Sequence, residues 1–258
     1  MIMNNPARSA QKLLHSLGYS EPSDLTIEEI AHACGYMIQY LEMDGSDGRI
    51  MMTHKEVLIS VKGSINYQPK INYILSHEIG HAILHRGIVP VFKDNQKTLS
   101  EWYAKGVHEM EANQFAVELL MPSDLFSRKV KNKKLSLPFI EEIAEYFGAS
   151  KTATFLRYKD LGSFPVMIVF IEEGIIKWKS CSEDFPFKWL PYQSKLPALT
   201  VAGDYYYHQV KEDKPVKVDA IEWFPEDRFL LNGNEQTKLW EQCFPINADS
   251  ILTCLWTA

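Results

Sequence analysis

Two histidines separated by three residues, His77 and His81, are the pair in this chain whose types and spacing point to chemistry. On an α-helix, residues four apart lie on one face, so both imidazole rings would project from the same side. Two such nitrogens suit a tetrahedral zinc ion. Glu78 follows the first histidine, which would place its carboxylate beside the open position of the metal as a general base for bound water. These residues predict a catalytic site with Zn²⁺ as its cofactor.

The segment from Tyr67 to Arg86 is predicted to form the helix that carries this pair. Pro69 stands where a first-turn proline is tolerated, and apolar residues recur at helical spacing. The alternative is a core helix with two hydrogen-bonded histidines, which is the poorer explanation because every buried polar group would need its own partner. Gly80 costs about 1 kcal/mol inside a helix, so we expect another backbone to approach it closely, opposite the metal face.

A catalytic zinc site keeps three protein ligands and one open position, so a third ligand is required. The segment from His108 to Pro122 is predicted to be a second helix, with an apolar stripe that ends at the proline. Glu109 and Asn113 are four residues apart and share a face of this helix. We therefore predict Glu109 as the carboxylate ligand and Asn113 as a hydrogen-bond partner of a ligating histidine.

Three neighbouring residues are weaker candidates for ligation. Glu111 points about 160 degrees away from the Glu109 face, so a solvated helix charge is its preferred interpretation. His108 is a rival ligand that is weakened by the same argument. His85 lies one turn beyond His81, and we expect it either to support a ligand or to end the helix.

Together these two helices resemble the ImmA/IrrE family of metallopeptidases, whose members pair H-E-x-G-H with a later E-x-E-A-N-x-F-A-x-x-L-L-M-P run. The matching segments here are His77 to His81 and Glu109 to Pro122, and the resemblance spans roughly residues 8 to 162. It implies a zinc-dependent endopeptidase that cleaves a protein regulator, typically a helix-turn-helix repressor or an antitoxin-like transcription factor. Many members carry an N-terminal DNA-binding domain. This chain begins too close to the catalytic unit to hold one, so we expect no promoter binding by its N-terminus.

Composition fits a soluble protein, which we expect to be cytoplasmic. The 258 residues suffice for one large or two modest domains. No apolar run approaches the ~20 residues of a membrane helix, so we expect neither a membrane span nor a membrane partner. The 4 cysteines are scattered and are expected to be free thiols. The net charge of -6 argues against a protein that chiefly binds nucleic acid.

The sequence pattern changes near residue 162, and we predict an α+β protein of two domains on either side of it. Residues 1–162 form the zincin-like metallopeptidase domain, which is mostly helical with a small sheet. Its strands are expected at Tyr36–Leu41 and Val57–Val61, around a loop at Asp44–Gly48. In zinc-peptidase folds a strand in the position of Val57–Val61 forms the lip of the cleft, where it can pair with an extended substrate.

A dense basic run at residues 128–134 is expected to be a solvated loop. Two helices follow within residues 137–160, with Gly148 as a helix stop and Ser150 as an N-cap. Their arrangement is helix-turn-helix-like, and we interpret both as packing helices. The basic run leaves direct binding of DNA, or of an acidic partner, as an open alternative.

Residues 163–258 are predicted to form a small β-rich or α+β domain. Val166–Ile171 and Ile175–Lys179 flank a turn signal and should form a hairpin. Further strands are predicted at Val216–Trp223, Arg228–Leu231 and Ile251–Trp256. This segment holds nine Lys or Arg and fourteen Asp or Glu residues, so it carries most of the net charge of -6. A sensory or substrate-docking role is our hypothesis from its position in the chain.

In the mechanism that we expect, Glu78 takes a proton from the attacking water and passes it to the leaving amine. A further donor must stabilise the oxyanion. The candidates by residue type are Tyr205, Tyr206, Tyr207 and His208. The alternative is a transcription regulator or binding protein whose zinc site is structural or vestigial. Glu78 favours the enzyme, because a structural site needs no carboxylate over an open position.

Overall fold

The computed structural model describes residues 5–86, 91–94, 106–234, 236–247 and 249–257. The chain divides into two compact units, Met1–Lys129 with Glu141–Ala153, and Val130–Ile140 with Thr154–Ala258. Each unit contains helices and its own β-sheet, which confirms the expected α+β class. The two units interleave along the chain between residues 130 and 153, and a functional boundary near residue 162 stays a prediction.

The first unit alternates helices with short strands. Its first seven elements are α1 (Pro6–Ser16), α2 (Ile27–Ala33), β1 (Met37–Leu41), β2 (Gly48–Met52), β3 (Val57–Lys62), α3 (Gln68–Leu84) and β4 (Val91–Asp94). They are followed by α4 (Val107–Leu120), α5 (Ser123–Val130) and α6 (Leu137–Phe147). The predicted metal helix and the helix of the third ligand therefore correspond to α3 and α4.

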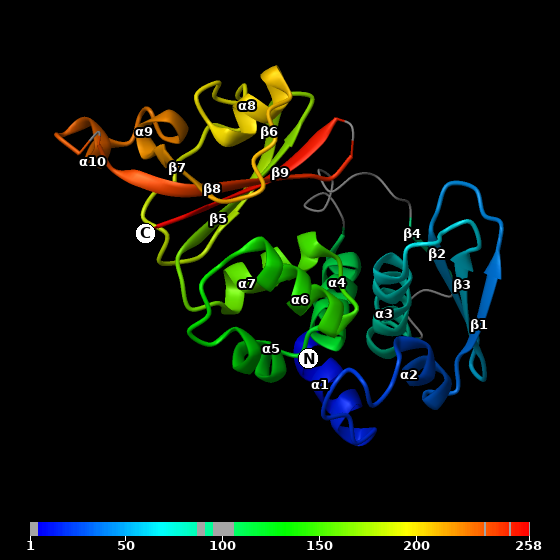
Figure 1. Cartoon of the computed structure of the whole chain (residues 1–258). Helices are drawn as coiled ribbons and strands as arrows, with labels where there is room; N and C mark the ends of the chain where they lie inside the picture. Colours follow the sequence, from blue (N-terminus) through cyan, green and yellow to red (C-terminus); the bar gives the residue numbers. More distant parts are fainter. Residues whose placement is uncertain (1–4, 87–90, 95–105, 235, 248, 258) are drawn as a thin grey trace. The chain divides into compact units, whose positions relative to one another are not determined.

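A four-stranded sheet with the order β1-β3-β2-β4 supports α3. β1 runs parallel to β3, while β2 is antiparallel to both β3 and β4. Because β3 is paired on both sides, the prediction that Val57–Val61 could pair with an extended substrate is wrong. In Figure 1, α3 lies between this sheet and α4. The core between the layers is apolar and fully buried at Ile50 and Ile59 of the sheet and at Leu75 and Ile79 of α3. Burial of this kind contributes roughly 1.5–3 kcal/mol for each large aliphatic side chain.

The crossing of α3 and α4 is close at Gly80, as the sequence predicted, but the approaching backbone belongs to the helix that carries Glu109 and does not lie opposite the metal face. A Cβ atom at Gly80 would lie 3.2 Å from the carbonyl oxygen of Ala112 and 3.2 Å from Cδ1 of Phe115. A larger residue would push the helices apart, because these neighbours are backbone and a fully buried ring. The glycine therefore lets α4 approach α3 one turn after the predicted carboxylate ligand.

Two loops predicted from the sequence are present but shorter than expected. Gly48 is the first residue of β2 and not the end of a loop. The first part of the basic run, Arg128 and Lys129, lies in the last turn of α5. α5 forms because Phe126 and Val130 are four residues apart, share a face, and are both fully buried. The charge run conceals this apolar pair in the sequence.

The two helices of the helix-turn-helix-like segment are α6 and α7 (Lys151–Leu161). Gly148 adopts φ +58° at the end of α6, and Oγ of Ser150 accepts a hydrogen bond from the N–H of Ala153. Both predicted signals, a glycine stop and a serine cap, are therefore confirmed. α7 buries Phe155 and Tyr158, as a packing helix does.

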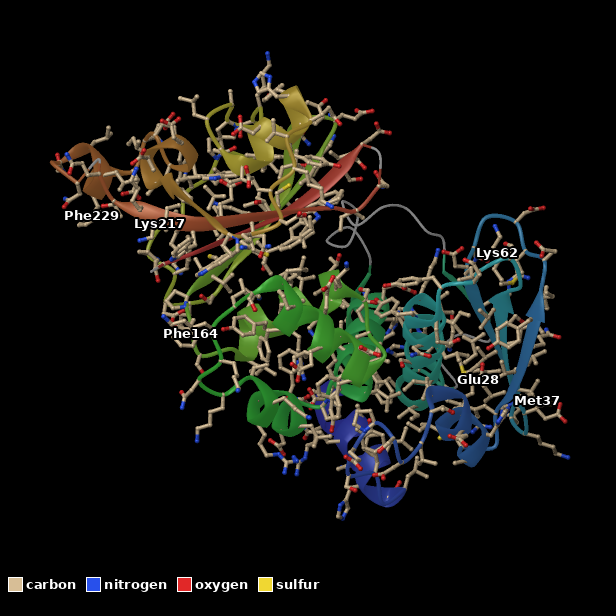
Figure 2. All side chains as sticks on the ribbon, viewed as in Figure 1. Glu28, Met37, Lys62, Phe164, Lys217 and Phe229 are labelled. Carbon is tan, nitrogen blue, oxygen red and sulfur yellow. The ribbon has the colours of Figure 1, made fainter. Side chains whose placement is uncertain are left out.

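The second unit is built on a five-stranded antiparallel sheet with the order β6-β5-β9-β8-β7. Its strands are β5 (Val166–Glu172), β6 (Ile175–Cys181), β7 (Val216–Asp219), β8 (Lys238–Pro245) and β9 (Ser250–Trp256). Its short helices are α8 (Val201–His208), α9 (Ala220–Trp223) and α10 (Arg228–Leu231). β9 is buried along its whole length. Lys217 of β7 lies with Nζ 5.0 Å from the ring centroid of Trp240, and Figure 2 labels this lysine together with the exposed Phe229 of α10.

Two of the strands predicted for this unit are helical in whole or in part. Residues Ala220–Trp223 and Arg228–Leu231 form α9 and α10. The side chain of Asp227 accepts hydrogen bonds from the N–H groups of Phe229 and Leu230, which starts a helical turn in place of a strand. The predicted hairpin of β5 and β6 and the predicted last strand are present.

No helix among the described residues is long and apolar enough to cross a membrane. The four cysteines are free thiols, as predicted.

Candidate metal centre

Three histidines at intervals of four residues form a ladder along α3. In this histidine ladder, Nε2 of His77 lies 3.0 Å from Nε2 of His81, and Nδ1 of His81 lies 3.0 Å from Nδ1 of His85. Each residue of the ladder is 1% exposed. His85 also caps the C-terminus of α3, where its backbone N–H donates to the carbonyl of His81. The sequence predicted the first pair on one helix face, and the structure extends it by one turn.

Glu109 projects from the first turn of α4 toward His77 and His81. Its Oε2 lies 3.3 Å from Nε2 of His77, and its Oε1 lies 3.3 Å from Nε2 of His81. The first turn of a helix favours a carboxylate because the unpaired N–H groups carry partial positive charge. The structure thus brings together the three residues that were predicted as ligands from two separate helices.

The spacing of these donor atoms fits a zinc ion. Ligand atoms around tetrahedral zinc with bonds of about 2.0–2.1 Å are separated by about 3.3 Å. The two imidazole nitrogens and the carboxylate oxygens lie 3.0 to 3.3 Å apart. The Nε2 atoms of His77 and His81 face each other, and the Glu109 carboxylate faces both. Together these atoms form a set of ligands for a cation.

Burial and charge prepare these groups for metal binding. Burial alone would raise the pKa of Glu109, but hydrogen bonds from His77 and His81 outweigh it and hold that pKa well below its usual range. Burial lowers the pKa of His81, and Glu109 offsets this only in part. At neutral pH the site therefore combines an ionised carboxylate with a neutral imidazole, which are the protonation states that a zinc ion requires.

Glu78 lies on the sheet side of α3 and is 1% exposed. A Cβ atom at Gly48 of β2 would come within 2.8 Å of its Oε1 and 2.5 Å of Cγ2 of Ile74. The start of β2 therefore packs directly against the predicted general base. Sequence reasoning missed Gly48 because its importance depends on a contact between residues 30 positions apart.

Asn113 makes a contact that the sequence did not predict. Its Oδ1 accepts a hydrogen bond from the hydroxyl of Tyr73, with 2.5 Å between the oxygens. Tyr73 stands four residues before His77 on α3, so the tyrosine belongs to the same helix face. Nδ1 of His77 is buried and has no hydrogen-bond partner among the described residues. The role predicted for Asn113 as partner of a histidine stays a prediction.

Glu111 is a paired group, contrary to the solvated charge expected from the sequence. Its Oε2 lies 2.9 Å from Nε2 of His85 and 3.5 Å from Nδ1 of His108. The rings of His85 and His108 are in edge contact, with 4.5 Å between their centroids. Helical spacing alone misjudged Glu111 because it considered only the first ligand pair and not the next histidine of the ladder.

The four residues suggested as oxyanion donors belong to α8 of the second unit. The hydroxyl of Tyr207 donates to the carbonyl of Leu196. The ring of Tyr206 packs against Gly174, where a Cβ atom would stand 2.6 Å from Cε1 of the ring. Both contacts are internal to the second unit. Oxyanion stabilisation by these residues stays a prediction.

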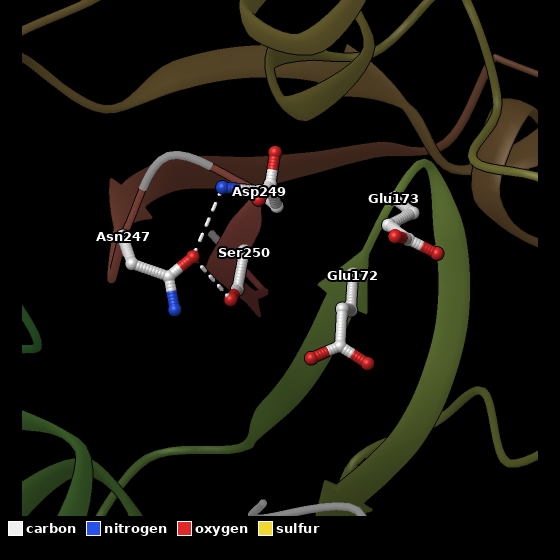
Figure 3. Close-up of a pocket in the computed structure, with 5 residues that line it drawn as sticks. All are labelled: Glu172, Glu173, Asn247, Asp249 and Ser250. Carbon is white, nitrogen blue, oxygen red and sulfur yellow. Dashed lines mark hydrogen bonds between the residues drawn. The ribbon is translucent and has the colours of Figure 1, made fainter.

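An acidic hollow opens at one end of the five-stranded sheet, where two turns meet (Figure 3). It is lined by Glu172, Glu173, Asn247, Asp249 and Ser250. Oδ1 of Asn247 accepts from the N–H of Asp249 and from Oγ of Ser250, so these polar groups serve the turn itself. We assign the candidate site to α3 and α4, because there the acidic and basic donors converge on one point.

Comparison with known proteins agrees with this location. Residues 35–159, which include the ladder and Glu109, match the profile of a peptidase family described as IrrE N-terminal-like domain. An 80-residue segment is 39% identical to "Uncharacterized immunity region protein 2" of Bacillus phage phi105. That match covers 31% of this chain and 46% of the phage protein, so the chain spans less than half of this relative.

A solved structure titled "Mycobacterium tuberculosis transcriptional regulator" has a similar fold. The TM-score is 0.61, and the alignment covers 98% of this chain and 77% of that chain. Only 11% of the aligned residues are identical, so the likeness concerns the fold alone.

Proposed function

Residues 35–159 belong to the ImmA/IrrE family, and on this premise we propose that the chain is a zinc-dependent endopeptidase that cleaves a protein regulator of transcription. The observation that carries the proposal is the convergence of His77, His81 and Glu109 on one point. Glu78 follows the first of these ligands on the same helix. This set supplies three protein ligands and one base, as a hydrolytic metal site requires.

His77, His81 and Glu109 would hold the zinc ion. When bound, zinc supplies a Lewis acid that lowers the pKa of water toward neutrality and polarises a peptide carbonyl. Glu78 accepts the proton of the attacking water and delivers it to the leaving amine. Gly48 packs beside the Glu78 carboxylate, because a Cβ atom there would come within 2.8 Å of Oε1.

The substrate class that we propose is a helix-turn-helix repressor or an antitoxin-like regulator. Support comes from the family resemblance and from the phage relative, whose name places it in an immunity region. Residues 163–258 would serve substrate docking or signal sensing. Their excess of acidic residues, fourteen against nine basic ones, complements the basic surface that DNA-binding regulators carry.

The competing proposal is a binding protein whose zinc is only structural. Structural zinc sites are closed by four protein ligands, whereas three ligands converge here among the described residues. Burial of the Glu78 carboxylate beside these three ligands costs desolvation free energy. In a purely structural site, no function would offset that cost.

Proteolysis can be tested with the purified 258-residue chain and a candidate helix-turn-helix regulator taken from a gene that neighbours its own. We expect a defined cleavage fragment that disappears when a chelator removes the metal and returns when zinc is added back. A regulator that stays intact with the zinc-loaded chain, while it binds that chain, would support the binding protein instead.

A further inference from the structure

His85, the last residue of the histidine ladder, forms a second group of possible metal ligands with His108 and Glu111 of α4. It lies directly beside the first group, because His85 contacts His81. Proton positions decide whether both groups can hold a metal at once. The role of His85 derived below rests on the proposed function, because it requires zinc bound to His81.

The first step concerns His81. Its Nε2 faces His77 and Glu109, so this nitrogen must offer its lone pair to the metal. A neutral imidazole then carries its one ring proton on Nδ1. That proton points at Nδ1 of His85, which lies 3.0 Å away.

The second step concerns His85. Its Nδ1 must accept the proton of His81, so the ring proton of a neutral His85 stands on Nε2. Nε2 lies 2.9 Å from Oε2 of Glu111 and donates to that carboxylate. A nitrogen that donates a proton has no lone pair for a metal. Binding of zinc by His81 therefore removes His85 from the ligands available to a second ion.

We propose that His85 and Glu111 form a hydrogen-bonded relay that fixes the tautomer and orientation of His81, and that the chain binds one metal ion and not two. His85 is a positioning residue, since it acts on the metal only through His81. A carboxylate at the end of such a relay also raises the basicity of the ligand. His77 differs, because its buried Nδ1 has no hydrogen-bond partner among the described residues.

Zinc titration of the full chain against a competing chelator tests the relay, with stoichiometry and affinity read separately from activity. We expect one zinc per wild-type chain and an affinity about 10–100-fold weaker in His85→Leu. His85→Gln should recover most of the loss, because the amide can accept from His81 and donate to Glu111. His108→Ala is the matched control, with an affinity near that of wild type.

Histidine tautomers in the zinc-loaded wild-type chain, read from long-range proton–nitrogen NMR correlations, give a test that does not depend on a variant folding. We expect the proton on Nδ1 of His81 and on Nε2 of His85. A proton on Nδ1 of His85 would overturn the relay. So would two zinc ions per wild-type chain, one of them lost in both His85→Leu and His108→Ala.

The outcomes separate this inference from the proposed function. One zinc per chain whose affinity is unchanged in folded His85→Leu would overturn the relay and leave the peptidase proposal standing. A wild-type chain that binds no zinc would overturn both.

Discussion

Gly48 of β2 lies against the carboxylate of Glu78, so closely that a Cβ atom there would stand 2.8 Å from Oε1. The same atom would stand 2.5 Å from Cγ2 of Ile74, so the space is closed on two sides. Even the smallest side chain at this position must displace the predicted general base or the strand. The sheet therefore helps to hold the carboxylate of Glu78 in place as well as supporting α3.

Gly48→Ala should lower peptidase activity by roughly 10²-fold or more, because general-base catalysis is worth about 10²–10⁴-fold and depends on the position of the base. Zinc content should stay near one per chain, since the atoms nearest to a Cβ at Gly48 belong to Ile74 and Glu78 and not to a predicted ligand. Gly63→Ala is the matched control, because its Cβ would meet neighbours only at 3.6 Å. Full activity in Gly48→Ala would show that Glu78 needs no support from β2.

Removal of one ligand should empty the metal site. Elemental analysis of purified His81→Ala and Glu109→Ala should show strong loss of zinc relative to about one zinc in the wild-type chain. Glu111→Gln should keep about one zinc with a weakened affinity, because Glu111 contacts His85 and His108 and acts on the first pair only through the relay. Retention in Glu109→Ala together with loss in Glu111→Gln would mean that the wrong carboxylate has been assigned.

Asn113→Ala should weaken zinc affinity by roughly 10–100-fold if its amide oxygen also accepts the ring proton of His77. That oxygen has two lone pairs, and the hydroxyl of Tyr73 uses one of them. Tyr73→Phe removes only the hydroxyl and should leave zinc affinity within a few-fold of wild type. Chelator competition on both variants measures the difference. Equal affinity in all three proteins would reduce Asn113 to a packing residue.

The metal-free chain should lose stability when the pH falls from 7.5 to 5.5. Burial lowers the pKa of His81 and of His85 in the folded state, so the unfolded chain binds more protons below about pH 6.5. Stability from these groups is present above that pH and is lost as the pH falls. Glu109 contributes in a lower window, because its pKa is depressed and its contribution fades only below about pH 4.3.

Urea unfolding of chelator-treated protein at several pH values measures this slope. His15→Gln is a suitable control because His15 is exposed, and it should leave the slope unchanged. A midpoint that does not change between pH 7.5 and 5.5 would contradict the prediction.

The metal helix and its ligand partner were predictable because their signals are local. Residues four apart on a helix share a face whatever surrounds them, so His77, His81 and the Glu109 helix follow from spacing. The close approach at Gly80 was predictable for the same reason, since a glycine inside a helix needs an explanation.

Contacts between distant segments were not predictable from spacing. The contact of Gly48 with Glu78 depends on the register of β2 in its sheet, and a slip of one residue would turn every side chain to the other face. The pairing of Glu111 with His85 depends on how α4 crosses α3. In the second unit, the fully buried Glu241 accepts hydrogen bonds from the first residues of α8 and from Trp223. No pattern in β8 indicates such a role.

Short apolar runs were the other source of error. Arg228–Leu231 has too few residues to show a helical or a strand period, so its apolar character alone suggested a strand. The capping side chain of Asp227 decides the outcome by starting a helical turn.

Peptidase activity of Glu78→Gln tests the central claim most directly. The amide is nearly isosteric with the carboxylate but cannot accept the proton of water, so zinc and fold should be retained while cleavage falls by roughly 10²–10⁴-fold. The measurement is co-expression with the neighbouring regulator, read as a cleaved fragment and as release of the regulated promoter. We expect fragment and release with the wild-type chain and neither with Glu78→Gln, although both proteins bind the regulator. Equal promoter release by both chains, with no fragment from either, would contradict proteolysis and establish binding as the mechanism.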